Sequence, residues 1–444
     1  MKVLLAAHHS PPNFQGGVEW VTLHGAQWLK AHGHQVEIAS VEEIRANLDG
    51  EVFSRVEEYQ GISIHRLSIP ASSPSARFET SYWNVAIERW FEQYFSKNHP
   101  DIFHLHSGYL LTLSALEAAS RSGIASVLSL HDYWTVCPRI NLLHPNGDRC
   151  PGPEKNRCAW CLLTEKRRFQ WPEALIGKSL QKIVGNSLVA HLIGMEGVAI
   201  QVQQRQDKIN AQLQQVEVIM ALGTLTRDLI LKQGVDPEKI MLSPNGLKTS
   251  GWQKTQNYKV PSDKLRIGYL GNLTPIKGAH VLVKAFRQLR SKNRELELRL
   301  YGNPAKAPEY ARQLRWLAGG DERIQFMGAY ENHRVPELFR ELDVLIVPSL
   351  WYEVCPLVIL EGQACLTPVI VSNLPNMSNQ IIDGVDGLTF EAGNDRSLTI
   401  VLQRLLDEPG LLAHLTYGIR PIRSHDEQMQ DWLMAYQKAL EKRA

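Results

Sequence analysis

The sequence predicts an α/β protein with two Rossmann-like domains, each built on a parallel sheet. Short runs rich in Val, Ile and Leu alternate with longer segments of helical periodicity, and the alternation occurs once in each half of the chain. Strands separated by helices are typical of parallel sheets covered on both faces. Residues 248–263 are polar and carry Gly251 and Pro261, which indicates a linker between the halves.

The periodicity places about six strands in each half. In the first half they are expected at residues 2–8, 36–40, 62–69, 101–107, 126–132, 216–222 and 240–244. In the second half they are expected at residues 265–271, 296–302, 323–328, 342–349, 368–373 and 387–390. The clearest helical patterns are at residues 18–32, 279–292, 356–365 and 426–442.

Composition excludes several classes of protein. The 444 residues contain 48 Lys and Arg against 46 Asp and Glu, so the net charge is only +2, which argues against a nucleic-acid binder. The first apolar run ends after Ala7, which is too short for a secretory signal peptide, and no segment has the roughly 20 apolar residues of a spanning helix. We therefore expect a soluble cytoplasmic protein.

Ligands of parallel α/β sheets bind beyond the carboxyl ends of the strands, so two such domains facing each other predict an interdomain cleft. In the first half, Gly16 and Gly17 follow the first strand and precede a helix, where backbone amides can approach an anion. The alternative is a plain tight turn. His131 and Asp132 end the fifth expected strand, where a histidine would face the cleft, although a lone histidine is more often structural.

In the second half, a strand leads through a glycine loop to Lys277 and Gly278, just before a helix. Lys277 would neutralise a phosphate there, and the alternative is a solvated surface lysine. Glu353 precedes the helix that begins near Pro356, and Glu361 lies inside that helix. A glutamate in an apolar helix requires a hydrogen-bonding partner, which a ribose diol would provide.

Together these motifs resemble glycosyltransferase family 4, whose members have the GT-B fold. The match consists, in chain order, of Gly16-Gly17, His131-Asp132, Pro244-Asn245-Gly246, the Lys277-Gly278 loop and Glu353-x7-Glu361. The resemblance implies an acceptor domain at 1–247 with a cysteine-rich insertion at about 133–165, a donor domain at 262–424, and a helix at 425–444 that crosses back to the N-terminal domain. It implies retaining transfer of a sugar from a nucleotide-diphosphate donor, with no metal ion required for catalysis.

The resemblance also implies roles for individual residues. His131 and Glu353 would be catalytic and contact the donor sugar, and Glu361 would bind the ribose. The remaining donor-binding positions are Gly16, Gly17, Asn272, Lys277, Cys355, Pro356, Leu357 and Val358. The acceptor would be a glycan, a lipid-linked sugar or a small molecule, in polysaccharide or glycoconjugate synthesis.

The chain departs from the family pattern at three asparagines. Asn272 stands where an arginine is usual, Asn376 where a glycine is usual, and Asn379 where a glutamate is usual. These departures keep two alternatives open: a GT-B epimerase or phosphorylase-like enzyme, and a catalytically weak subunit that binds nucleotide sugars.

Four cysteines follow His131-Asp132 with the spacing C-x12-C-x7-C-x2-C, in a segment rich in Pro and Gly; they are Cys137, Cys150, Cys158 and Cys161. A loop with little core of its own is held well by four thiolates on a structural zinc ion, with an iron–sulfur cluster as the second choice. Reduced structural thiols are the alternative, and disulfides would require an oxidising compartment.

Residues 166–171 are basic and aromatic, and an apolar stretch with Lys178 and Lys182 follows them. A basic amphipathic helix of this kind rests on the inner membrane face beside a lipid-linked acceptor, which would make the protein peripheral to the membrane. The favoured interpretation is a helix that packs on its own domain with solvated lysines.

Overall fold

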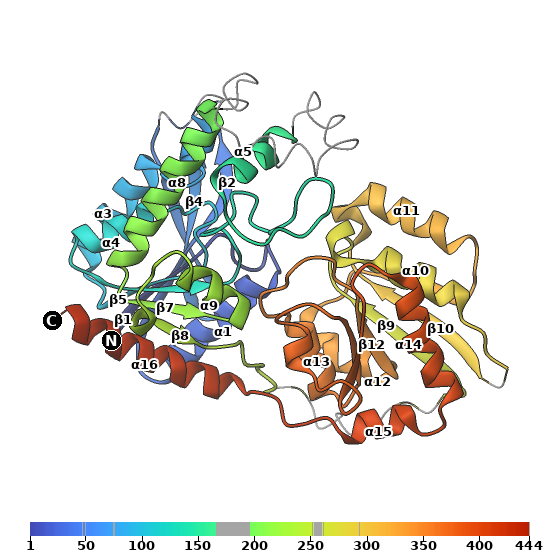
Figure 1. Ribbon diagram of the computed structural model, residues 1–444. Helices are drawn as coiled ribbons and strands as arrows, with labels where there is room; N and C mark the ends of the chain where they lie inside the picture. Colours follow the sequence, from blue (N-terminus) through green and yellow to red (C-terminus); the bar gives the residue numbers. More distant parts are fainter. Residues whose placement is uncertain are drawn as a thin grey trace. The chain divides into compact units, whose positions relative to one another are not determined.

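The computed structural model describes residues 1–444 except 47, 49, 74–75, 166–195, 251, 253–259, 261, 293 and 444. The chain divides into two compact units, each with its own sheet and helices (Figure 1). Unit 1 comprises Met1–Pro244 and Gln428–Ala444, and unit 2 comprises Asn245–Glu427. Both are α/β units, so the predicted fold class is confirmed.

In the described part of unit 1, eight strands form one sheet in the order β3-β4-β2-β1-β5-β6-β7-β8. Neighbouring strands are parallel, apart from the antiparallel pair of β3 and β4. The strands are β1 (Lys2–Ala7), β2 (Gln35–Arg45), β3 (Phe53–Tyr59), β4 (Ile62–Pro70), β5 (Ile102–Leu105), β6 (Ala125–Leu130), β7 (Val218–Ala221) and β8 (Ile240–Leu242). The helices described are α1 (Gly17–Ala31), α2 (Arg77–Thr80), α3 (Val85–Asn98), α4 (Ser114–Arg121), α5 (Lys155–Leu163), α8 (Glu196–Gln215), α9 (Thr224–Leu231), the 3-10 turn η1 (Pro237–Lys239) and α16 (His425–Arg443).

In unit 2, the described strands form a parallel sheet in the order β11-β10-β9-β12-β13-β14. They are β9 (Lys264–Leu270), β10 (Glu295–Tyr301), β11 (Ile324–Gly328), β12 (Val344–Val347), β13 (Val369–Ser372) and β14 (Gly387–Phe390). The helices are α10 (Ala279–Gln288), α11 (Pro308–Ala318), α12 (Val335–Arg340), α13 (Leu357–Ala364), α14 (Asp395–Asp407) and α15 (Leu411–Tyr417). Short 3-10 turns are η3 (Pro275–Lys277), η4 (Pro304–Lys306), η5 (Asn332–Arg334) and η6 (Ser378–Gln380).

The sheet of unit 2 is buried on both faces. Successive residues of β12 point to opposite sides, so Ile346 joins a core formed with α10, α11 and α14. Leu345 and Val347 join a second core formed with α12 and α13. This burial explains why β12 reads as an unbroken apolar run instead of an alternating pattern.

The predicted strands are all present, with some ends shifted, and one strand was missed. That strand is β3, which pairs with β4 at the edge of the unit 1 sheet. Its residues Phe53–Val56 are exposed, and its charged side chains hide the alternation that marks a half-buried strand. The helix expected at 279–292 ends earlier, at Gln288, because Leu289 adopts extended backbone and is buried in the core.

Two expectations fall largely outside the described residues: the basic segment at 166–182 and most of the linker at 248–263. None of the helices in the described part of the chain combines the length and the apolar composition that crossing a lipid bilayer requires.

The C-terminal helix α16 is part of the core of unit 1. Trp432 is 2% exposed, and its ring occupies the space into which a Cβ on Gly25 of α1 would project, only 2.4 Å away. The same ring lies 4.8 Å from the rings of His104 and His106. The last helix therefore closes the unit whose first strand lies more than 400 residues earlier in the chain.

We predict that Trp432→Ala lowers the free energy of unfolding by about 3–5 kcal/mol, because it removes a large buried ring from a close-packed site. The matched control is Met434→Ala on the same helix, where the side chain is 54% exposed and the expected loss is below about 1 kcal/mol. Urea denaturation of the full chain measures both changes. Equal losses in the two variants would contradict the proposed packing of α16.

Candidate functional site

The strand order of each sheet marks where a ligand would bind. In unit 2 the order reverses at β9, whose neighbours are β10 and β12, and a crevice forms beyond the carboxyl ends of the strands at such a point. The loops after β9 and β12 carry Lys277 and Glu353. In unit 1 the corresponding neighbours are β1 and β5, and β6 lies next to β5. The Gly16–Gly17 loop follows β1, His106 follows β5, and His131 follows β6.

The two loops of unit 2 contact each other through their backbones. Gly278 has φ 74° and ends the 3-10 turn that carries Lys277. A Cβ on Gly278 would lie only 1.8 Å from the carbonyl oxygen of Pro348, and the Leu350 amide donates to the Ile276 oxygen at 2.8 Å. Only glycine tolerates both this conformation and this approach, which explains its place after the lysine.

The close approach brings Lys277 to Glu353. One carboxylate oxygen of Glu353, Oε1, accepts hydrogen bonds from Lys277 Nζ at 2.7 Å, Ser349 Oγ at 2.6 Å and Trp351 Nε1 at 2.8 Å. The Glu353 side chain is 6% exposed and that of Lys277 is 28% exposed. Three donors on one oxygen fix the orientation of the Glu353 carboxylate, which in turn holds the Lys277 ammonium at the edge of the sheet.

Asn376 explains one departure from the family pattern. Its φ is 66°, in the left-handed region where glycine is favoured and asparagine is the best-tolerated substitute. Its side-chain Nδ2 donates to the backbone oxygen of Glu353 at 3.2 Å, so the residue also supports the loop that carries the carboxylate. Asn272 is exposed, and its backbone oxygen accepts a hydrogen bond from Tyr269 Oη at 2.7 Å.

The start of α13 lies directly after this loop. Pro356 is the N-cap residue of the helix and not, as the sequence indicated, part of its first turn. Leu357 and Val358 are the first helical residues, so their amides have no acceptor within the helix. The oxygen of Cys355 accepts from Asn245 Nδ2 at 3.4 Å, which ties the Pro-Asn-Gly motif to the same loop. Free amides and the helix dipole make this terminus suited to an anion.

Glu361 lies one turn further along α13 and is buried, with 9% of its surface exposed. The described part of the chain gives its carboxylate no hydrogen bond or ion pair, and burial raises the pKa of Glu361 to about 7. An unpaired buried carboxylate is costly, so the site is suited to a ligand that donates hydrogen bonds.

The Gly16–Gly17 loop in unit 1 differs from a simple anion site. Gly16 is the N-cap of α1, and Glu19 in the first turn folds back so that a Cβ on Gly16 would lie 2.5 Å from its Oε2. Glu19 is buried and its Oε1 lies 3.4 Å from His8 Nε2. The helix terminus therefore already carries one negative charge, which a bound phosphate would oppose.

Arg66, which belongs to none of the sequence motifs, holds the same loop in place. This arginine is 2% exposed, and its Nη1 and Nη2 donate to the backbone oxygens of Ser10 and Pro11 at 3.2 and 2.5 Å. Arg66 lies on β4 in no recognisable motif. A charged residue in the middle of a strand that is largely buried was the one usable signal.

His131 belongs to a row of histidines at the strand ends of unit 1. Its Nε2 lies 3.1 Å from His106 Nδ1. The ring of His104 is tilted against that of His106 at 4.1 Å, and its nitrogens hydrogen-bond Ser129 Oγ and Tyr436 Oη at 2.8 and 2.9 Å. Burial, and then the charge of His8, lower the pKa of His131 to about 3. His131 is therefore a neutral hydrogen-bonding group at physiological pH.

Asp132 takes no part in this row. Its carboxylate accepts from Ser107 Oγ at 2.6 Å and from the Trp134 amide at 2.8 Å, so it shapes the loop that follows β6. The His131-Asp132 motif thus combines one residue at the strand edge with one that fixes the backbone beside it.

The four cysteines of the motif line a single small cavity in unit 1. Within the residues that the structure describes, no three His, Cys, Asp or Glu side chains are already arranged as a metal-ligand set. Metal binding by Cys137, Cys150, Cys158 and Cys161 stays a prediction.

Two protein-family models match the chain, one in each unit. Residues 16–169 match the glycosyl transferase 4-like domain, and residues 251–420 match the glycosyl transferases group 1 family. A D-inositol 3-phosphate glycosyltransferase of Stackebrandtia nassauensis is 31% identical over 228 residues, which cover 47% of this chain and 51% of that protein. The chain thus spans about half the length of these curated relatives.

Solved structures resemble the chain over nearly its whole length. Sucrose-phosphate synthase of Thermosynechococcus elongatus has a TM-score of 0.66 and 17% identity, with 99% of each chain covered. Anabaena HepE, in complex with UDP and glucose, has a TM-score of 0.61 and 13% identity, with 100% of this chain and 99% of that one covered. The two family matches and this shared two-domain fold show that the chain belongs to glycosyltransferase family 4 and has the GT-B fold.

Proposed function

We propose that the protein is a retaining glycosyltransferase that moves a sugar from a nucleoside diphosphate to a hydroxyl acceptor. The observation that carries the proposal is the cluster at the edge of the unit 2 sheet. There Lys277, held by Glu353, lies on the same strand-end edge as the free amides of α13 and the unpaired carboxylate of Glu361. A cation and an anion-binding helix terminus suit the diphosphate of such a donor, and a buried carboxylate suits its ribose hydroxyls.

The diphosphate would be bound by Lys277 and by the amides of Leu357 and Val358. A preorganised cation and helix dipole stabilise negative charge as it develops on the leaving group, without reorganising during the reaction. The ion pair with Glu353 fixes the ammonium before the donor binds. Because these groups supply the positive charge, the proposed step needs no metal ion.

Glu361 would accept hydrogen bonds from the ribose hydroxyls, and Glu353 would contact the donor sugar while it orients Lys277. Ribose hydroxyls satisfy a carboxylate that the protein leaves unpaired, so binding would favour the ionised form of Glu361 and lower its pKa. His131 would hydrogen-bond the sugar near the reacting carbon as a neutral imidazole. With a pKa of about 3, it does not supply a proton at neutral pH.

In the proposed reaction, the bond from the sugar's anomeric carbon to the diphosphate oxygen breaks, and a bond from that carbon to the acceptor oxygen forms on the same face. The acceptor's proton passes to the departing phosphate oxygen. The protein therefore needs groups that stabilise charge and position the reactants, and it needs no nucleophile of its own.

UDP-glucose is the first donor to test, because the similar structure of HepE contains UDP and glucose. Inositol phosphate is one acceptor to test, because the relatives are D-inositol 3-phosphate glycosyltransferases. The decisive experiment measures UDP release and glycoside formation by the purified full chain, over panels of nucleotide sugars and acceptors. Acceptor-dependent release supports the proposal. Release of free sugar without any acceptor would indicate an epimerase-like or hydrolytic enzyme, and binding without turnover would indicate a binding subunit.

We predict that Lys277→Ala lowers kcat/KM by about 100- to 1,000-fold, the range expected when one preorganised charge is lost from a site of developing negative charge. Lys284→Ala, an exposed lysine on α10, is the matched control and should keep full activity. Initial rates of UDP release measure both. If Lys277→Ala keeps at least half of the wild-type rate, the diphosphate does not bind at this edge.

We predict that His131→Ala lowers kcat by about 100-fold, because a hydrogen bond to the reacting sugar is lost, while His333→Ala, with a 72% exposed side chain, has no effect. The pKa of His131 is about 3, so His131 does not change its protonation between about pH 5 and pH 8. The pH profiles of the wild type and of a His131→Asn variant should therefore have the same shape in this range. Rate profiles of the wild type and His131→Asn test this. An ionisation near pH 6.5 that only the wild type shows would contradict the neutral assignment.

Glu361 gives a prediction about stability with a definite sign. Its pKa rises from an ordinary value of 4.5 to about 7 on folding, so the folded chain holds more protons than the unfolded chain between these values. Its contribution to stability therefore falls as the pH rises through this window. Glu361→Gln should make the ligand-free protein more stable than the wild type at pH 8, by roughly 1–3 kcal/mol, and this advantage should shrink toward pH 5.

Urea denaturation at several pH values measures this difference, with Glu309→Gln, an exposed residue of α11, as the control. The same Glu361→Gln variant should bind UDP at least 10-fold more weakly, since one buried acceptor for the ribose loses its charge. A variant that is less stable at pH 8, or that binds UDP as tightly as the wild type, would remove Glu361 from the proposed role.

A further inference from the structure

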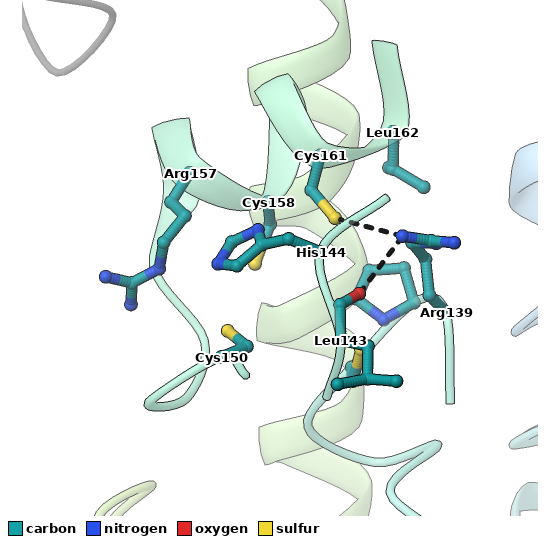
Figure 2. Close-up of a pocket in the computed structure, with 10 residues that line it drawn as sticks. Arg139, Leu143, His144, Cys150, Arg157, Cys158, Cys161 and Leu162 are labelled. Carbon is teal, nitrogen blue, oxygen red and sulfur yellow. Dashed lines mark hydrogen bonds between the residues drawn. The ribbon is translucent and has the colours of Figure 1, made fainter. Parts of the chain in front are cut away.

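The cysteine-rich segment contains a cluster of thiols that the proposed sugar transfer does not use. Four cysteines line one cavity of about 20 Å³, together with His144 and two arginines (Figure 2). Three of the cysteines are only 9% exposed, and no disulfide joins any of the four. The cavity is about as large as one water molecule, and it therefore accommodates one ion.

Three separate stretches of backbone bring the thiols together. Cys137 lies in a turn after β6, and Cys150 directly follows a short hairpin at residues 143–149, which the antiparallel bridge at its ends closes. Cys158 and Cys161 lie on α5, three positions apart and thus on one face of the helix. Four thiols from three segments thus line one small space, and side-chain rotations are needed before they form the ligand set of a structural metal site.

Arginine side chains lie beside the thiols. Cys137 is close enough to interact electrostatically with each of the other three cysteines. Arg139 Nη1 lies 3.8 Å from Cys161 Sγ, and Arg157 interacts with Cys150. Two guanidinium groups beside four sulfur atoms would offset the excess negative charge of a tetrathiolate site, the part that groups around metal ligands usually play.

The loop that carries these residues has strained backbone. Ile140 and Leu142 have φ values of 73° and 53°, a region that branched side chains avoid. Such a conformation persists where surrounding contacts impose it. An ion bound by residues on both sides of the strained turn would supply that constraint.

We propose that Cys137, Cys150, Cys158 and Cys161 bind one Zn²⁺ ion, which fixes the segment at residues 133–165. Binding replaces four S–H bonds by four Zn–S bonds and releases four protons to solvent, with no change of oxidation state. Cys150 Sγ, which now donates to the Gly152 oxygen at 3.2 Å, and Cys161 Sγ, now beside Arg139, rotate toward the ion. A single ion fits the cavity.

The test is the metal content of the full-length protein, purified without chelator and under anaerobic conditions, by mass spectrometry of the elements. We expect one zinc per chain in the wild type and in Cys365→Ala, a buried cysteine of unit 2 that lies outside the cavity. We expect at least a fivefold lower zinc content in the Cys158→Ser/Cys161→Ser double variant, because two of the four ligands are gone.

A second measurement keeps the test decisive if the double variant fails to fold. Co²⁺ added to the reduced, zinc-free wild type should give thiolate-to-cobalt absorption that saturates at one equivalent, and zinc should abolish it. Wild-type protein with no zinc and no such absorption would overturn the site. Stoichiometric iron with visible absorption would overturn the choice of zinc, and zinc that stays in the double variant would overturn the choice of ligands.

Discussion

The arrangement at the edge of the unit 2 sheet depends on one close approach of backbone to backbone. Gly278 lies against the carbonyl of Pro348, at a distance that no other residue allows, and so brings the loops after β9 and β12 into contact. Lys277, the residue before this glycine, then reaches Glu353. A side chain at position 278 would push the loops apart and separate the cation from its carboxylate, even if every polar residue of the site remained.

The structure treats its ionisable groups in three different ways. Glu353 is buried and receives three donors on one oxygen, whereas Glu361 is buried and has no partner among the residues that the structure describes, which opposes its charge. His131 is kept neutral by burial and by a neighbouring histidine. Of these three groups, Glu361 is the one whose carboxylate would gain hydrogen bonds from a ligand. Leaving it without them lowers the stability of the ligand-free protein.

Much of the fold was predictable because its strands are buried on both faces, and an apolar run in such a strand needs no knowledge of its neighbours. The exposed edge strand β3 lacks that signal and was missed. The motifs in the sequence do not show that Lys277 pairs with Glu353, because this pairing depends on the contact between two loops that lie 76 positions apart in the chain. Likewise, Asn376 differs from the family pattern in the sequence, while its φ of 66° lies in the region that favours glycine.

The histidine row connects this chemistry to the stability of unit 1. Tyr436 of α16 hydrogen-bonds His104, whose ring contacts that of His106, and His106 in turn hydrogen-bonds His131. Trp432 packs against the rings of His104 and His106. Since these rings are neutral and close-packed, the orientation of His131 depends on the same contacts that hold the last helix in the core. Loosening α16 would thus shift His131 although the helix does not contact it. The position of this candidate catalytic group therefore depends on the packing of the unit 1 core.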